Sequence, residues 1–148
     1  MSVPYRPDGY HTVTPYLVVE DIPKTLSFLK RAFGAEEREL VTLPDGTVNH
    51  AAVAIGDSAI MLGMAPSGEW TPVASTLYVY VQDTDAVYRS ALAAGATSLM
   101  EPANQYYGDR NAGVQAPDGV RWWIATHIEE VPYAELLRRN AARAVKRG

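Results

Sequence analysis

Histidine, tyrosine and arginine are the side chains of this sequence best suited to chemistry, and His50 is the first candidate. It lies in the expected strand TVNHAAVAI, where Val53 and Ile55 mark the core face and His50 takes the other face. A histidine there could act as a general base or as a hydrogen-bond donor near neutral pH. It could equally bond a neighbour at the sheet edge and do nothing else, and the spacing leaves both readings open.

A second group of candidates lies in the stretch YYGDR, before the penultimate expected strand. Tyr106 and Tyr107 could stack on a ring, and Arg110 could clamp an anionic group. Asp109 and Arg110 could instead cap and brace the turn. We favour the structural role for these two residues and pocket lining for the tyrosines.

The other candidates are more isolated. Arg121 could be a pocket cation opposite a carboxylate or phosphonate, or it could reach the rim and be solvated. We expect His11 at a mouth or on the surface, and His127 in a structural contact with the segment HIEEV that it opens. The three histidines do not share the spacing of a metal-binding triad.

The elements that must position these residues occur twice. TPYLVVEDIPKTLSFLKRAFGA (14–35) and TLYVYVQDTDAVYRSALAAGA (76–96) each predict a strand, then an aspartate, then a helix closed by Gly34 or Gly95. Three expected strands with glycine-containing turns follow in each half, so the pattern is βαβββ repeated after about 62 residues. We expect one domain over 1–148, with modules at about 10–65 and 74–130 and a C-terminal helix at 131–148.

The strand DGVRWWIATH carries two adjacent tryptophans, which must point to opposite faces of a sheet. Trp122 shares its face with Ile124, so we place it in the core under the helices. Trp123 then faces the other way, and the question is what it contacts there.

Composition excludes several functional classes. The chain has no cysteine, which removes disulfides and thiol chemistry and fits a cytoplasmic protein. A net charge of −4 gives no basic field for nucleic acid, and no apolar run approaches the roughly 20 residues that cross a membrane. The start MSVPYRPDGYHT lacks the apolar segment of a secretory signal. Phosphate-binding loop, dinucleotide-binding, nucleophile-elbow and HExxH motifs are missing from the sequence.

Two βαβββ modules in one chain resemble the vicinal oxygen chelate superfamily, which comprises glyoxalases, bleomycin-resistance proteins and extradiol dioxygenases. The resemblance spans about residues 10 to 130. GYHTVTPYLVV, IGDSAIML and YYGDRNAGVQAPDGVRWWIATHIEEV resemble, more narrowly, its PhnB-like branch. The resemblance implies an α+β fold in which the modules join edge to edge into curved mixed sheets around a cavity, with the protein commonly a homodimer.

Metal-dependent members hold one divalent ion through four side chains in that cavity. The corresponding positions here are Thr14, Met61, Thr76 and Trp123. Hydroxyl, thioether and indole groups do not make a site for such an ion, which prefers imidazole and carboxylate ligands, so we expect no metal and no cofactor. Strand parity adds the remaining residues of the expected ligand-binding set, which are Tyr16, Tyr78, Tyr80 and Arg121.

These residues support two functional hypotheses. The first is a metal-independent small-molecule-binding protein of the glyoxalase/bleomycin-resistance type that encloses an aromatic or planar ligand. The second is an isomerase, epimerase or lyase on a small oxygenated metabolite, with His50 as acid/base and with or without a displaced metal. A stable domain without chemistry is a third possibility, and whether the protein is an enzyme stays open at this stage.

Overall fold

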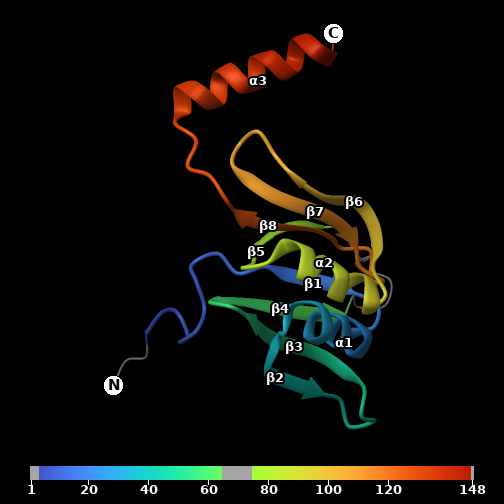
Figure 1. The fold of residues 1–148 in the computed structure, drawn as a ribbon. Helices are drawn as coiled ribbons and strands as arrows, with labels where there is room; N and C mark the ends of the chain where they lie inside the picture. Colours follow the sequence, from blue (N-terminus) through green and yellow to red (C-terminus); the bar gives the residue numbers. More distant parts are fainter. Residues whose placement is uncertain (1–3, 65–74, 148) are drawn as a thin grey trace.

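The computed structural model describes residues 4–64 and 75–147. Each half of the chain is a βαβββ module, and a helix follows the second (Figure 1). The first module contains β1 (Tyr16–Val19), α1 (Ile22–Phe33), β2 (Glu36–Thr42), β3 (Val48–Ile55) and β4 (Ser58–Met64). The second contains β5 (Thr76–Tyr80), α2 (Thr84–Ala93), β6 (Thr97–Asn104), β7 (Asp109–Gln115) and β8 (Arg121–His127), and α3 (Tyr133–Arg147) ends the chain. The predicted repeat is therefore confirmed.

The aspartate that follows each first strand begins the helix. Asp21 and Asp83 both take extended backbone, and each carboxylate accepts a hydrogen bond from a backbone N–H of the first turn, at 3.1 Å. These caps satisfy donors that the helix itself leaves free. Gly34 ends α1 in the left-handed conformation, with φ of 67°, where glycine has no steric cost.

Each module forms its own four-stranded mixed sheet. The strand orders are β1-β4-β3-β2 and β5-β8-β7-β6, with the first strand parallel to the last one and the other neighbours antiparallel. All strand pairs in the described residues lie within one module. The sheets are therefore separate here, and the edge-to-edge joining that the family resemblance implied is not seen between them.

The modules are held together by a common core beneath the helices. α1 and α2 pack against each other, and the α1 residue Phe33 contacts Trp122 of the second module with 4.7 Å between ring centroids. Trp122 is only 2% exposed, as predicted, and Ile124 beside it is fully buried. The Thr25 hydroxyl of α1 also donates to Asp118 in the β7–β8 turn, at 2.9 Å. Hydrophobic burial across this contact joins the two modules.

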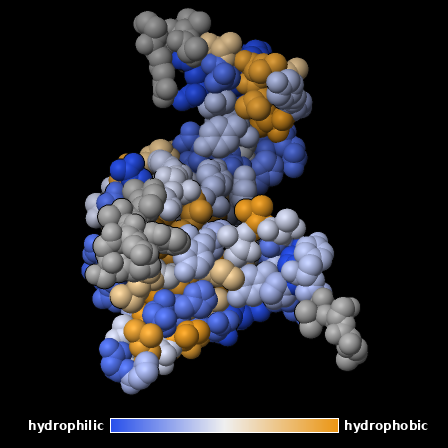
Figure 2. Space-filling model, turned by 180° about the vertical axis from the view of Figure 1, so that it is seen from behind, coloured by the Kyte–Doolittle hydropathy of each residue, from blue (hydrophilic) through white to orange (hydrophobic). Residues whose placement is uncertain are grey.

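α3 stands apart from this body. Figure 1 shows it beyond the tip of the β6–β7 hairpin, joined to the end of β8 by a short extended segment. Figure 2 shows apolar side chains gathered on this part of the molecule, where Tyr133 and Leu137 are exposed by 74% and 51%. A helix with such an apolar face normally covers another surface.

The two neighbouring tryptophans provide a test of this architecture. Trp122→Ala should destabilise the fold by ~3–5 kcal/mol, because it removes a buried ring from the contact between modules. Trp123→Ala should cost much less, since its indole is only partly buried on the opposite face. Thermal denaturation of the two variants measures the difference.

Trp122→Phe is the matched control. The Trp122 indole N–H is buried without a hydrogen-bond partner, so a phenyl ring keeps much of the packing and removes an unpaired donor. The melting temperature of the Trp122→Phe variant should lie close to that of the wild type. Equal melting temperatures for Trp122→Ala and Trp123→Ala would contradict the assignment of the two faces.

Candidate functional site

The face of the second sheet opposite its helix carries a polar network centred on Asp109. This side chain is 5% exposed, yet it is a carboxylate at the start of β7. Its Oδ2 accepts hydrogen bonds from the hydroxyls of Tyr78, at 2.6 Å, and Tyr80, at 3.0 Å. Its Oδ1 lies 2.9 Å from Nδ1 of His127. Three donors thus compensate a charge that would be costly to bury alone.

These contacts shift the pKa values of Asp109 and of Tyr78. Burial acts to raise the pKa of Asp109, but hydrogen bonds from Tyr78, His127 and Tyr80 outweigh it and hold that pKa below its ordinary value. The pKa of Tyr78 is raised, first by burial and then by its hydrogen bond to Asp109. The site therefore favours an ionised carboxylate and protonated tyrosines.

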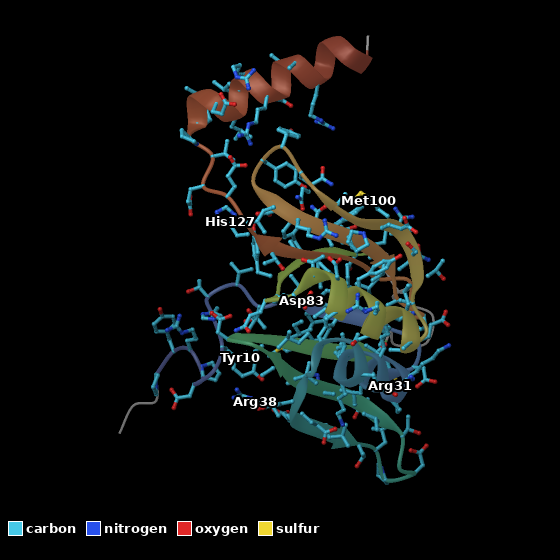
Figure 3. All side chains as sticks on the ribbon, viewed as in Figure 1. Tyr10, Arg31, Arg38, Asp83, Met100 and His127 are labelled. Atoms are coloured by element: carbon cyan, nitrogen blue, oxygen red, sulfur yellow. The ribbon has the colours of Figure 1, made fainter. Side chains whose placement is uncertain are left out.

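His127 extends the network to the surface. It lies at the end of β8, where the chain leaves the sheet towards α3 (Figure 3). Its Nε2 is 3.1 Å from Glu130, so both ring nitrogens face carboxylates. The hydrogen bonds to Asp109 and then to Glu130 raise the pKa of His127. Two acceptors favour the imidazolium, because only that form donates from both nitrogens. The predicted structural contact with HIEEV is confirmed.

Asn111 carries the network into a pocket. Its Nδ2 donates to the hydroxyls of Tyr78, at 3.2 Å, and Tyr107, at 2.6 Å. Its Oδ1 is buried without a partner among the described residues. The pocket has a volume of about 330 Å³, and it is lined by Tyr78, Met100, Gln105, Tyr106, Tyr107, Asn111, Trp123 and Arg143. Its walls come from the sheet, the β6–β7 hairpin and α3.

Glycine makes room for the largest ring in this pocket. A Cβ atom at Gly113 would collide with the six-membered ring of Trp123, so the indole lies directly over the backbone of β7. The first sheet repeats the arrangement, because a Cβ at Gly63 would collide with the phenol ring of Tyr16. In each module an aromatic side chain therefore rests on a glycine of the neighbouring strand.

The first sheet brings together a smaller set of the predicted residues. His50 stacks with Tyr16, with 6.2 Å between ring centroids, and its Nε2 is 3.9 Å from Glu39. Met61 lies beside Tyr16 in the strand register. None of these residues lines the Trp123 pocket, which belongs wholly to the second module and α3.

The four positions that correspond to metal ligands do not form a donor set. Thr14 precedes β1, and its hydroxyl donates to the carbonyl of His11, whereas Thr76 opens β5 and is exposed. Met61 and Trp123 lie on separate sheets, and an indole offers no lone pair to a metal. Over residues 4–64 and 75–147, no group of three or more histidine, cysteine or acidic side chains is arranged to hold an ion. The metal of metal-dependent relatives does not fit these residues.

The predicted arginines are engaged elsewhere. Arg110 forms a two-point salt bridge with Asp85 in the first turn of α2, at 2.7 and 2.9 Å, and donates to Asn104. Arg121 is exposed and bonds Gln115. His11 is exposed as predicted, and its ring bonds the carbonyl of Asp57.

A larger cavity of about 420 Å³ lies between the modules. It is lined by the segment before β1, the β3–β4 turn, β4, β5 and Trp122 of β8, and its apolar residues include Pro15, Ile60, Leu77 and Val79. Tyr78 and Tyr80 reach both this cavity and the Asp109 network. Most of its lining is apolar, and His11, Asp57 and Ser58 of the first module add polar groups to it.

Sequence reasoning missed several residues of this site. Asp109 was assigned to a turn, whereas it organises the network. Met100, Asn111 and Arg143 were not singled out, and neither was Gly113. Gly113 had a readable signal, because a glycine inside a strand often marks close approach of another group. Asp109 and Asn111 depend on contacts with other strands of the sheet and Arg143 depends on where α3 lies, neither of which local patterns encode.

Comparison with known proteins agrees with this architecture. The sequence profile of the Glyoxalase/Bleomycin resistance protein/Dioxygenase superfamily matches residues 10–124. The chain belongs to this superfamily. The match covers both modules, and α3 lies beyond it.

Individual relatives give the same result. The chain is 35% identical over 136 residues to the uncharacterized protein Mb0911c of Mycobacterium bovis, covering 84% of this chain and 88% of that protein. It is also 35% identical to the uncharacterized protein Rv0887c of Mycobacterium tuberculosis, covering 84% and 79%.

Solved structures share the fold at lower identity. TioX from Micromonospora sp. ML1 superposes with a TM-score of 0.68 at 22% identity, over 80% of this chain and 99% of that one. A glyoxalase/bleomycin resistance protein/dioxygenase family enzyme from Burkholderia phytofirmans gives 0.64 at 22% identity, over 78% and 97%. Among the described residues, no helix has the length and apolar character needed to span a membrane.

The His127 network predicts a pH-dependent contribution to stability. Because folding raises the pKa of His127, its ion pairs stabilise the fold fully below the ordinary histidine value of about 6.5. That contribution is lost as the pH rises through the folded-state pKa. His127→Gln should therefore lower the melting temperature most near pH ~6, where the imidazole is charged. The effect should become smaller as the pH rises towards ~9 and the imidazole loses its proton.

Glu130→Gln is the matched control. The Glu130 side chain is 94% exposed, so its removal should have a smaller effect, with the same pH dependence. A stability difference between wild type and His127→Gln that grows towards alkaline pH would contradict the assignment.

Proposed function

We propose that this protein binds a planar or aromatic small molecule in the Trp123 pocket, without a metal. The observation that carries the proposal is the indole of Trp123, which lies against Gly113 and lines one pocket with Tyr78, Tyr106 and Tyr107. Aromatic side chains offer stacking area at low entropic cost. The volume of about 330 Å³ suits a small ligand.

The polar network beneath the pocket supports binding more than catalysis. The hydroxyls of Tyr78 and Tyr80 give their protons to hydrogen bonds with an ionised Asp109, which keeps both phenols protonated and unsuited to act as bases. Such a network orients a ligand without exchanging protons with it.

The segment YYGDRNAGVQAPDGVRWWIATH supplies most of this site, which supports placing the protein in the PhnB-like branch. The lack of cysteine fits a cytoplasmic location.

His50 favours a second candidate function on the first sheet. Its contact with Tyr16 and its approach to Glu39 at 3.9 Å give an imidazole with a possible orienting carboxylate. An isomerase, epimerase or lyase acting on a small oxygenated metabolite would use His50 as acid/base. The two candidates use different sheets, which makes them separable by mutation.

Paired glycine substitutions test the proposal. Gly113→Ala should displace the Trp123 ring and weaken binding of fused-ring probes such as quinoline and 2-naphthalenemethanol at least about tenfold, by loss of stacking. Gly63→Ala makes the same chemical change beneath Tyr16 and should leave the affinity unchanged. Isothermal titration calorimetry measures both.

The opposite result would place the ligand site on the first sheet. If Gly63→Ala or His50→Gln abolished binding and Gly113→Ala did not, the Trp123 pocket would not be the ligand site. Circular dichroism of each variant separates a loss of binding from a loss of fold.

We also propose that the protein is a homodimer. The apolar face of α3, with Tyr133 and Leu137, and the exposed β2 residues Leu40 and Val41 are surfaces that a second copy would cover. Light scattering at micromolar concentration should give about twice the 16.2 kDa of the chain. Leu137→Glu should increase the monomer fraction, whereas a 16.2 kDa particle for the wild type would contradict the proposal.

A further inference from the structure

We propose that the ligand of the Trp123 pocket is an aromatic anion, whose carboxylate, sulfonate or phosphate is received by Arg143 of α3. This inference rests on the proposed function and specifies the chemistry of the ligand. α3 closes one side of the pocket through Arg143, although the sequence pattern gave this helix no functional role.

α3 is fixed to the β6–β7 hairpin by contacts with Tyr106. The Tyr106 hydroxyl donates to Asn140, at 3.0 Å, and the Tyr106 carbonyl accepts from Arg139, at 3.0 Å. Arg139 also forms a two-point salt bridge with Glu129, at 3.0 and 2.8 Å. One helical turn beyond Arg139, Arg143 therefore reaches the pocket from a defined direction.

Arg143 differs from the neighbouring arginines in its pairing. Arg138 and Arg139 both bind Glu135, and Arg139 also binds Glu129, so two carboxylates balance these two charges. Arg143 lies over the Tyr106 ring, 4.3 Å from its centroid. The described part of the chain offers Arg143 no carboxylate. A partly buried guanidinium held on an aromatic face keeps its hydrogen-bond donors available for a planar anion.

The other charges around the pocket do not oppose an anion. Asp109 is compensated by two tyrosines and His127. Glu129 and Glu135 are paired with Arg139. Among the described residues that line the pocket, Arg143 is the one that carries a charge, so the charge on the pocket wall is positive.

Tyr107 adds a second donor. Its hydroxyl oxygen accepts from Asn111 at 2.6 Å, so its own proton is free to point into the pocket. A ligand ring stacked on Trp123 would then place its anionic group between Tyr107 and Arg143, which line the same cavity. Arg110, which the sequence offered as a candidate anion clamp beside the favoured structural role, is bound by Asp85, whereas Arg143 has no such partner among the described residues.

A matched pair of probes tests the inference. 2-Naphthoate and 2-naphthalenemethanol share a fused ring and differ in charge. The wild type should bind 2-naphthoate roughly three- to tenfold more tightly, the range expected for a partly exposed ion pair. Arg143→Gln should remove this preference, because it should weaken the binding of 2-naphthoate more than that of 2-naphthalenemethanol. Arg138→Gln, on the same helix but paired with Glu135, should retain the preference.

The remaining outcomes are distinguishable. Equal affinity of the wild type for both probes would overturn the anion inference alone, as would an unchanged preference in Arg143→Gln. Equal weakening of both probes by Arg143→Gln would assign Arg143 to holding the pocket wall and would also overturn it. Failure of the wild type to bind either probe would overturn the proposed function together with this inference.

Discussion

The alternation of side chains along β8 couples the core of this protein to its pocket. Trp122 and Trp123 are adjacent in sequence, so a pleated strand must send one to each face. Trp122 completes the contact with Phe33 that joins the two modules. Trp123 is thereby required to face the other side, over Gly113. A shift of β8 by one residue would exchange the two rings and destroy the core and the pocket together.

The buried charge of Asp109 imposes a second requirement on the same sheet. A carboxylate at the start of β7 needs donors, and they come from β8 and β5, the next two strands on one side of β7. The tyrosines that compensate it are thereby fixed in position. Asn111 then links this network to Tyr107 at the pocket. Electrostatic compensation inside the fold therefore determines which polar atoms a ligand meets.

Much of the fold could be predicted from the sequence because its signals are local. The aspartate caps, Gly34 and the two alternating first strands are each readable within a few residues, and the repeat fixes their order. The face of Trp122 followed from parity alone. The separation of the two sheets did not follow, because it depends on how α1 packs on the second module through Phe33 and Thr25.

The site was harder to predict because its decisive contacts join distant segments. Tyr106 and Tyr107 were recognised as pocket residues, but Asp109, two positions further, was assigned to a turn. Its role depends on Tyr78 and Tyr80, about 30 residues away in the chain. Arg110 was a reasonable anion clamp until Asp85 of α2 was seen to bind it. Arg143 lies on a helix whose partner surface, the β6–β7 hairpin, no periodicity reveals.

The rings that rest on Gly63 and Gly113 also constrain how this protein can change over evolution. Any side chain at Gly113 collides with an indole at position 123, and any at Gly63 collides with a phenol at position 16. Replacing either glycine therefore requires its aromatic partner to move away or to become smaller. The two positions of each pair should thus covary among relatives that bind different ligands.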